Sequence, residues 1–137
     1  MPRVVGIDPG TVSMDLCGLE DGRVYLDRAL PTAEVARAPE RLVEAIAAGP
    51  VPELVVGPSG YGLPLVPLEA VGERELFLAF LPAPGGSRGV GGLRRAVGAL
   101  RGLGVPVVFL PGVVHLPTVP AHRKANRIDL GTADKVA

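Results

Sequence analysis

The chain has 137 residues, a single cysteine and a formal net charge of zero. This length predicts one domain, 1–137, large enough to bury a core. The zero net charge does not favour a general nucleic-acid or membrane surface, and one cysteine excludes an internal disulfide framework. No apolar run approaches the roughly 20 residues of a membrane span, and no signal-peptide pattern opens the chain. We therefore expect a cytoplasmic protein with no nucleic-acid partner and no membrane partner.

The opening of the chain predicts a meander of three antiparallel strands. Val4 to Ile7 is an apolar run short enough for a buried strand. The tetrapeptide Asp8-Pro9-Gly10-Thr11 that follows is typical of a type II turn, because proline presets φ and glycine accepts a positive φ. Residues 14–19 form a second strand of mixed pattern, and an Asp-Gly turn leads to a third strand that begins at 24–26. Asp8 therefore lies at the tip of the first strand.

The first turn is the first candidate site. Its backbone N–H groups could face outward as an anion cradle, and the hydroxyls of Thr11 and Ser13 would add donors beside Gly10. A carboxylate next to such a cradle, here that of Asp8, suits Mg²⁺ that keeps several waters. The alternative is that Asp8 only caps a tight turn. The pattern is neither a P-loop nor a dinucleotide fingerprint, since a hairpin and not a helix follows it.

A helix and a fourth strand come next. Residues 32–49 are predicted to be helical, with Pro39 at a first helical position, and Gly49-Pro50 ends the helix. Leu54 to Gly57 is a short continuous apolar run, typical of a strand buried on both faces. The order strand, helix, strand predicts a crossover to a parallel neighbour.

The loop after the fourth strand is the second candidate site. It contains Ser59, Gly60, Tyr61 and Gly62, which would bring backbone and two hydroxyls close to a ligand. Ligands of open α/β sheets collect outside the carboxyl ends of the strands. The alternative is a plain turn-rich connection, and the loop lacks the Gly-x-Ser-x-Gly pattern of a nucleophile elbow.

The rest of the chain predicts two more helices and a fifth strand. A helix is expected over about 67–84, interrupted near Gly72, and an amphipathic helix carries apolar residues from Leu93 to Leu100. Its arginines fit a solvated helix face better than a nucleic-acid surface. Residues 105–110 form the fifth buried strand.

The last segment holds His115 in an apolar, proline-rich stretch and ends in a helix start. His115 has no Cys or His at metal-ligand spacing, so a half-buried role fits it better than a metal ligand. Thr132 suits an N-cap and Asp134 a first helical turn. Because the chain stops at Ala137, we expect this helix to be cut short and the chain to be an N-terminal fragment.

Four motifs carry a resemblance. The opening resembles the first phosphate-binding hairpin of the superfamily of acetate and sugar kinases, heat-shock ATPases and actin. The whole chain resembles an archaeal and bacterial family labelled predicted butyrate kinase. The shared motifs are Gly6 to Thr11, Pro58 to Pro64, Pro111 to Val113 with His115 to Pro120, and Asn126 to Asp129 with Gly131 to Lys135.

This resemblance implies a full protein more than twice as long, with two ribonuclease-H-like halves and ATP in the cleft between them. It further implies that Asp8 positions Mg²⁺ and that Gly10, Thr11 and Ser13 approach the transferred phosphoryl group. The substrate side, for a small-molecule acceptor such as a carboxylic acid, would be lined by Ser59, Gly60, Tyr61, Gly62, His115, Asn126 and Asp129. The second half would carry the other phosphate loop, so this chain alone is expected to be inactive.

We therefore expect an α/β domain of the ribonuclease-H-like kind, with a mixed five-stranded sheet in the order three-two-one-four-five and helices on its faces. The expected function is the N-terminal half of an ATP-dependent phosphotransferase. One alternative is a non-catalytic nucleotide-binding, ligand-binding or assembly module. Another is a resolvase-like nuclease, which needs several carboxylates for two metals. The expected partner is the missing C-terminal half, or a second copy bound through exposed apolar surface.

Overall fold

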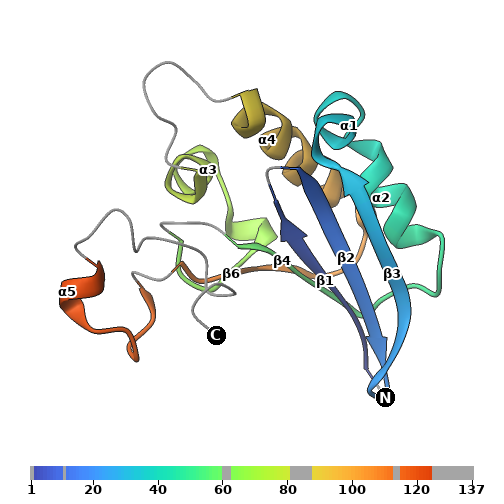
Figure 1. The fold of residues 1–137 in the computed structure, drawn as a ribbon, viewed down its shortest axis with the longest axis horizontal. Coiled ribbons are helices and arrows are strands. Elements are labelled where there is room, and N and C mark those ends of the chain that lie inside the picture. The colour runs from blue at the N-terminus through green and yellow to red at the C-terminus, as the bar shows by residue number, and fades with distance from the viewer. Residues whose placement is uncertain (1, 11, 60–62, 81–87, 113–114, 125–137) are drawn as a thin grey trace.

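One mixed sheet of six strands runs through the computed structural model of the protein (Figure 1), which describes residues 2–10, 12–59, 63–80, 88–112 and 115–124. The strand order is β3-β2-β1-β4-β6-β5. Strands β1, β2 and β3 are antiparallel neighbours, β4 lies parallel to β1, and β6 lies parallel to β4. The elements are β1 (Arg3–Pro9), β2 (Ser13–Glu20), β3 (Arg23–Pro31), α1 (Thr32–Arg37), α2 (Glu40–Ala47), β4 (Leu54–Ser59), β5 (Val66–Pro67), the 3₁₀ turn η1 (Leu68–Ala70), α3 (Glu73–Phe80), α4 (Arg88–Leu100), the 3₁₀ turn η2 (Arg101–Leu103), β6 (Val107–Leu110) and α5 (Ala121–Lys124).

The strand order agrees with the expected one for all five predicted strands, and a sixth strand is added at the far edge. This extra strand, β5, pairs antiparallel with β6 through Val66 and Pro67 alone. The expectation of five strands was therefore wrong by one. Two residues are too few to show the alternation that identifies a strand from sequence, and a proline is tolerated there because the strand lies at an edge.

The predicted helix over 32–49 is two helices, α1 and α2. The break lies at Ala38, whose φ of −134° and ψ of 76° are not helical. A residue before proline is disfavoured in the helical region, and Pro39 follows Ala38. Pro39 itself is the N-cap of α2 rather than its first helical residue.

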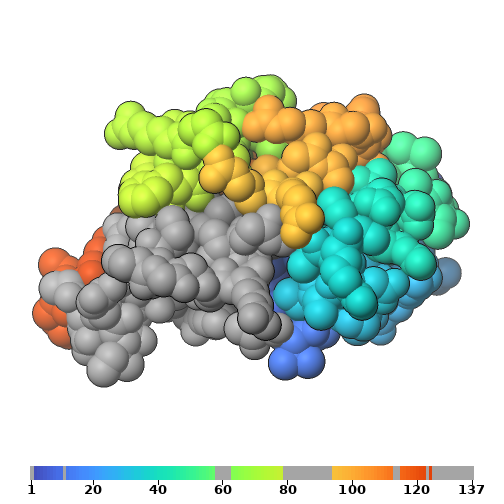
Figure 2. Space-filling view, turned by 90° about the horizontal axis from the view of Figure 1, so that it is seen from above, coloured from blue at the N-terminus to red at the C-terminus, as the bar shows by residue number. Residues whose placement is uncertain are grey.

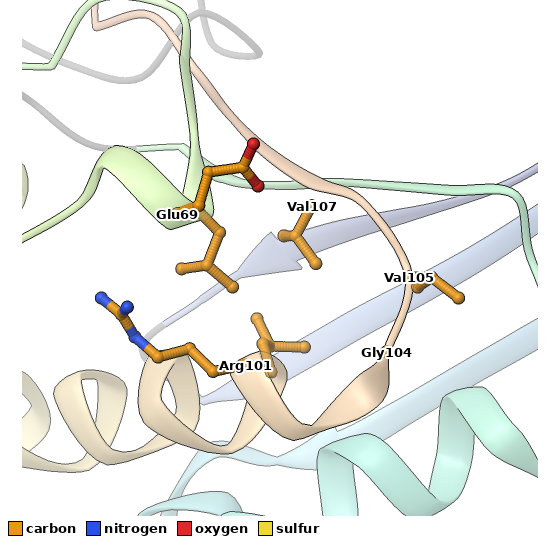
Figure 3. A pocket seen from close by; sticks show the side chains of 7 residues that line it. Glu69, Arg101, Gly104, Val105 and Val107 are labelled. Carbon is orange, nitrogen blue, oxygen red and sulfur yellow. The ribbon is translucent and has the colours of Figure 1, made fainter.

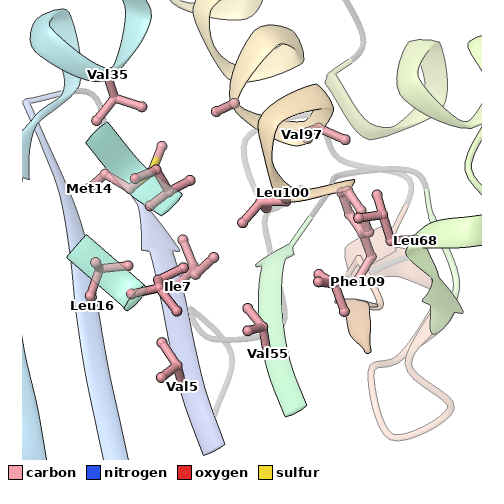
Figure 4. Close-up of a cluster of buried hydrophobic side chains, with 14 of the residues drawn as sticks. Val5, Ile7, Met14, Leu16, Val35, Val55, Leu68, Val97, Leu100 and Phe109 are labelled. Carbon is pink, nitrogen blue, oxygen red and sulfur yellow. The ribbon is translucent and has the colours of Figure 1, made fainter. Parts of the chain in front are cut away.

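Helices α1, α2 and α4 pack against one another and cover one face of the sheet (Figures 1 and 2). The core lies beneath them, as Figure 4 shows: Val35 of α1 and Leu100 of α4 face the side chains of Ile7, Leu16 and Val55. All of these side chains are buried, and Phe109 of β6 is fully buried. Burial of this apolar surface is the main term that stabilises the fold.

Two other helix predictions differ in extent. The helix expected over about 67–84 is η1 followed by α3, which begins after the predicted interruption at Gly72. The helix expected around Leu93 to Leu100 is α4, which begins earlier, at Arg88. The helix expected at Thr132 lies outside the described residues. None of the described helices has the length and apolar character that crossing a membrane requires.

On the opposite face of the sheet, strands β1 to β3 present exposed side chains. The pairing register places Asp8, Asp15, Cys17 and Asp27 on this face, and all four are exposed. Large apolar side chains are exposed on β2 and β3 as well: Leu19 is 44% exposed and Val24 60%. This face is called the open face below.

A cluster of Arg3, Gly18, Glu20 and Tyr25 lies at the end of the meander away from Asp8. The Arg3 guanidinium pairs with the Glu20 carboxylate at 2.6 Å and lies 6.0 Å from the centre of the Tyr25 ring. Gly18 is required here, since a Cβ would come within 2.7 Å of that ring. The Tyr25 hydroxyl is buried and has no hydrogen-bond partner among the described residues.

Replacing Tyr25 by phenylalanine is therefore expected to raise the free energy of unfolding by about 1 kcal/mol at neutral pH, because a buried hydroxyl without a partner is removed. Burial raises the pKa of Tyr25 above its ordinary value, although the charge of Arg3 opposes this. Because the pKa of Tyr25 is higher in the folded state than the value of about 10 in the unfolded chain, the protonated hydroxyl contributes stability below about pH 10. This contribution is lost as the pH rises through the pKa that Tyr25 has in the folded state. Urea unfolding from neutral to alkaline pH should show the loss in the wild type and a smaller loss in Tyr25→Phe. Equal losses in the two proteins would contradict this account.

Candidate functional site

Two carboxylates lie opposite each other near the end of the first hairpin. The β1–β2 register pairs Asp8 with Asp15, and both residues are exposed on the open face. Residues directly opposite in an antiparallel pair have their Cβ atoms roughly 4.5–5.5 Å apart. Both carboxylates can therefore approach one cation from the same face of the sheet.

This pair lies where β1 and β4 separate. The two strands pair only from Val4 with Leu54 to Gly6 with Val56, although both continue further. Gly57 marks the separation: its φ is +102°, and a Cβ there would lie 2.5 Å from the Ile7 carbonyl oxygen. Only glycine fits so close to the backbone of β1.

The carboxyl ends of β1, β4 and β6 meet at one edge of the sheet, because these strands are parallel. The backbones of Asp8 and Ser59 lie at this edge, and Ser59 pairs with Leu110. Strands β2 and β3 lie on one side of β1 in the sheet, and the later strands β4, β6 and β5 lie on the other side. In α/β sheets such a switch point is where ligands bind.

The turn next to Asp8 is held by hydrogen bonds from two sides. The Gly10 N–H donates to the Ser13 carbonyl oxygen over 2.9 Å, and a Cβ on Gly10 would lie 2.5 Å from that oxygen. Thr32, the first residue of α1, donates its N–H to the Val12 carbonyl (2.9 Å) and its Oγ1 hydroxyl to the Gly10 carbonyl (2.8 Å). Helix α1 thus fixes the tip of the hairpin.

The expected turn over Asp8 to Thr11 was placed too early. Asp8 and Pro9 still belong to β1, and the hairpin closes between Gly10 and Ser13. Because the Gly10–Ser13 pair is hydrogen-bonded and such pairs alternate, the nitrogen of Pro9 faces away from β2. This nitrogen faces the side of β1 where β4 no longer pairs, so the lack of an N–H on Pro9 loses no hydrogen bond of the sheet.

This correction changes the site. The N–H of Gly10 is used inside the turn and is not available to a phosphate, contrary to the expected cradle; glycine here gives close approach only. The register also brings in Asp15, which the sequence reasoning missed. A turn over Asp8 to Thr11 would have placed Asp15 opposite Val4, far from the site. Thr32 was missed too, and its signal was present as a threonine at a predicted helix start.

The structure brings together only part of the predicted residue set. Asp8, Gly10 and Ser13 lie together at the hairpin tip, and Ser13 is half-buried at the start of β2. His115 follows β6 and is exposed, so the expected half-buried role was wrong. Its backbone N–H donates to the Gly112 carbonyl over 3.0 Å. The residues of the prediction that lie outside the described part of the chain are Thr11, Gly60, Tyr61, Gly62, Asn126 and Asp129.

The donor set of the hairpin fits a hard cation that keeps water. Within the described residues, no group of three or more His, Cys, Asp and Glu side chains could hold a metal ion. Mg²⁺ in phosphoryl-transfer sites is bound by one or two carboxylates, several waters and the phosphates of the substrate. Asp8 and Asp15, two exposed carboxylates on one face, match that requirement.

Comparison with known proteins gives a family for the chain. No curated protein and no solved structure matched it. One family model did, and it spans residues 6–137, from the strand that carries Asp8 to the last residue of the sequence. The chain therefore belongs to the family described as "Protein of unknown function (DUF1464)".

Proposed function

We propose that this domain is the N-terminal, ribonuclease-H-like half of an ATP-dependent phosphotransferase. The observation that carries the proposal is the Asp8–Asp15 pair at the edge where β1 and β4 separate. Support for the ribonuclease-H-like assignment comes from the strand order and from the three antiparallel strands followed by parallel β4 and β6. The resemblance to the family labelled predicted butyrate kinase favours a small carboxylic acid as the acceptor.

In this function the hairpin tip positions charge. Asp8 and Asp15 would hold Mg²⁺, which when bound neutralises negative charge on the phosphates. Gly10 allows the tight turn, since a Cβ there would lie 2.5 Å from the Ser13 carbonyl oxygen, and the Ser13 hydroxyl can donate a hydrogen bond to a phosphate. Thr32 holds the turn in one geometry, which matters because phosphoryl transfer depends mainly on positioning and electrostatic stabilisation.

Binding of Mn²⁺ tests the metal site directly. In nuclear magnetic resonance spectra of the protein, substoichiometric Mn²⁺ is expected to broaden the amide signals around Asp8 and Asp15 before all others. Asp8→Asn and Asp15→Asn should each weaken this broadening by about tenfold, as for the loss of one contact to a charged group. Asp27→Asn, an exposed aspartate on the same face of the neighbouring strand, is the matched control and should leave it unchanged.

If Mn²⁺ broadens the same signals equally in the wild type, Asp8→Asn and Asp15→Asn, the two carboxylates do not bind the metal and the proposal is wrong. The same titration with ATP, and then with a DNA junction, separates the reaction classes. Enhancement of Mn²⁺ binding by ATP favours the phosphotransferase, whereas tight binding of DNA favours the nuclease.

The open face favours a second candidate, a non-catalytic assembly module. Leu19 and Val24 expose apolar surface on neighbouring strands that no described helix covers. Such a surface is expected to make the chain self-associate as its concentration rises, and Val24→Asp should return it to the monomer. Light scattering measures this directly, and a monomer at all concentrations would argue against the module.

A further inference from the structure

A pocket lies between the two 3₁₀ turns (Figure 3). It is at the end of the sheet opposite to Asp8. It has a volume of about 220 Å³ and is formed by η1, by the end of α4 with η2, and by the start of β6. Its lining residues are Leu68, Glu69, Leu100, Arg101, Gly104, Val105 and Val107. Because Val107 begins β6, whereas Asp8 lies at the carboxyl edge, the pocket is separate from the site proposed above.

The pocket combines an apolar floor with two opposite charges. Leu68, Leu100 and Val107 are buried, whereas Glu69 and Arg101 are exposed. Figure 3 shows the Glu69 and Arg101 side chains toward one end of the pocket and Val105 at the other. The two charged groups therefore lie on the rim of one hollow with apolar walls.

Both charged groups retain capacity to bind a ligand. Arg101 donates one N–H of its guanidinium to the Val71 carbonyl, which anchors the side chain beside the pocket. A guanidinium has five donors, so others remain for a carboxylate. Within the described part of the chain, neither Arg101 nor Glu69 forms an ion pair, and they do not pair with each other.

The size and charges of the pocket restrict its ligand. Pockets for drug-sized molecules occupy roughly 300–1,000 Å³, so this one suits a smaller molecule. A ligand with only a carboxylate would be repelled by the negative charge of Glu69, and a ligand with only an ammonium group would be repelled by the positive charge of Arg101. A molecule that carries both charges satisfies both groups, and the apolar floor requires a short aliphatic part.

We infer that this pocket binds a small zwitterion with a short aliphatic side chain, of the kind of an aliphatic amino acid. Its carboxylate contacts Arg101, its ammonium group contacts Glu69, and its side chain lies on Leu68, Leu100 and Val107. This inference stands apart from the phosphotransferase proposal, since it uses neither Asp8 nor the open face.

A titration with three matched ligands tests the inference. L-valine carries both charges, isobutyrate only the carboxylate and isobutylamine only the ammonium group. We expect L-valine to shift the methyl signals of Leu68, Leu100 and Val107 saturably, with a dissociation constant on the order of 1 mM. Each of the other two ligands should bind about tenfold more weakly, because one hydrogen bond to a charged group is lost.

Charge-removing variants complete the test. Glu69→Gln should weaken L-valine binding about tenfold while leaving isobutyrate binding unchanged or stronger. Arg101→Gln should likewise weaken L-valine binding about tenfold while leaving isobutylamine binding unchanged or stronger. Arg101→Lys keeps the positive charge if the glutamine variant is unstable, and Arg95→Gln, exposed on α4, is the control that should change nothing. The inference is overturned if L-valine gives no saturable shift, if isobutyrate binds as tightly as L-valine, or if Glu69→Gln has no effect.

Discussion

In the proposed phosphotransferase, Asp8→Asn is expected to lower phosphoryl transfer about a hundred- to a thousandfold while the fold stays nearly intact. The substitution keeps the shape of the side chain at an exposed strand position, so its structural cost should be small. It removes one of the two negative charges that would hold Mg²⁺ beside the transferred phosphate. Electrostatic contributions of this kind are worth about 3–4 kcal/mol. Steady-state rates with ATP, Mg²⁺ and a panel of small carboxylic acids measure the effect.

The neighbouring aspartates make the result specific. Asp15→Asn should lower the rate in the same assay, because Asp15 lies opposite Asp8, whereas Asp27→Asn should leave it within about twofold. A thermal melt of each variant separates lost activity from lost structure. If Asp8 only stabilised the hairpin, Asp8→Asn would change the melting temperature slightly and the rate hardly at all, and the proposed phosphate site would be wrong.

Gly57→Ala is expected to destabilise the fold by about 3 kcal/mol or more, with a fall of roughly 10 °C in Tm. Two costs add at this position. The φ of +102° is strained for any residue with a Cβ, and the new methyl group would lie 2.5 Å from the Ile7 carbonyl oxygen, which belongs to rigid backbone. Relief requires β4 to move away from β1, next to the strand that carries Asp8.

Gly98→Ala is the matched control, since it makes the same chemical change in the exposed part of α4. A Cβ there meets nothing within 4 Å, and its φ is not in the positive range. It should raise stability by about 0.5–1 kcal/mol, because alanine is the better helix former. Chemical denaturation of both variants decides the matter: a Gly57→Ala protein as stable as Gly98→Ala would show that the close approach of β4 to β1 is not required.

Local patterns in the sequence determined five of the six strands and the order of those five in the sheet. The apolar runs at Val4 to Ile7 and Leu54 to Gly57 are strands because they are short, continuous and bounded by proline and glycine. The helix between the third and fourth strands makes β4 a parallel neighbour of β1, which brings Asp8 and Ser59 to one edge. These features follow from interactions within a few residues, or from a general rule of chain connection.

The hairpin register was decided by the tertiary structure. Both a turn over Asp8 to Thr11 and the observed turn over Gly10 to Ser13 keep Ile7 on the buried face, because the two registers differ by an even number of residues and side chains alternate with a period of two. The hydrophobic pattern therefore cannot distinguish them. What distinguishes them is Thr32, distant in sequence, which bonds the carbonyls of Gly10 and Val12.

The same dependence on tertiary contacts explains why the sequence did not reveal Asp15 beside Asp8 or the pocket at Glu69 and Arg101. Asp15 lies opposite Asp8 only in the observed register, and the pocket at Glu69 and Arg101 exists only because η1, the end of α4 with η2 and the start of β6 surround it. Strand β5 likewise forms because β6 offers it an edge, and not because two residues favour a strand. Sequence periodicity records which side of an element is buried. Which elements face each other, and with which residues, depends on contacts between distant segments that leave no periodic signal in the chain.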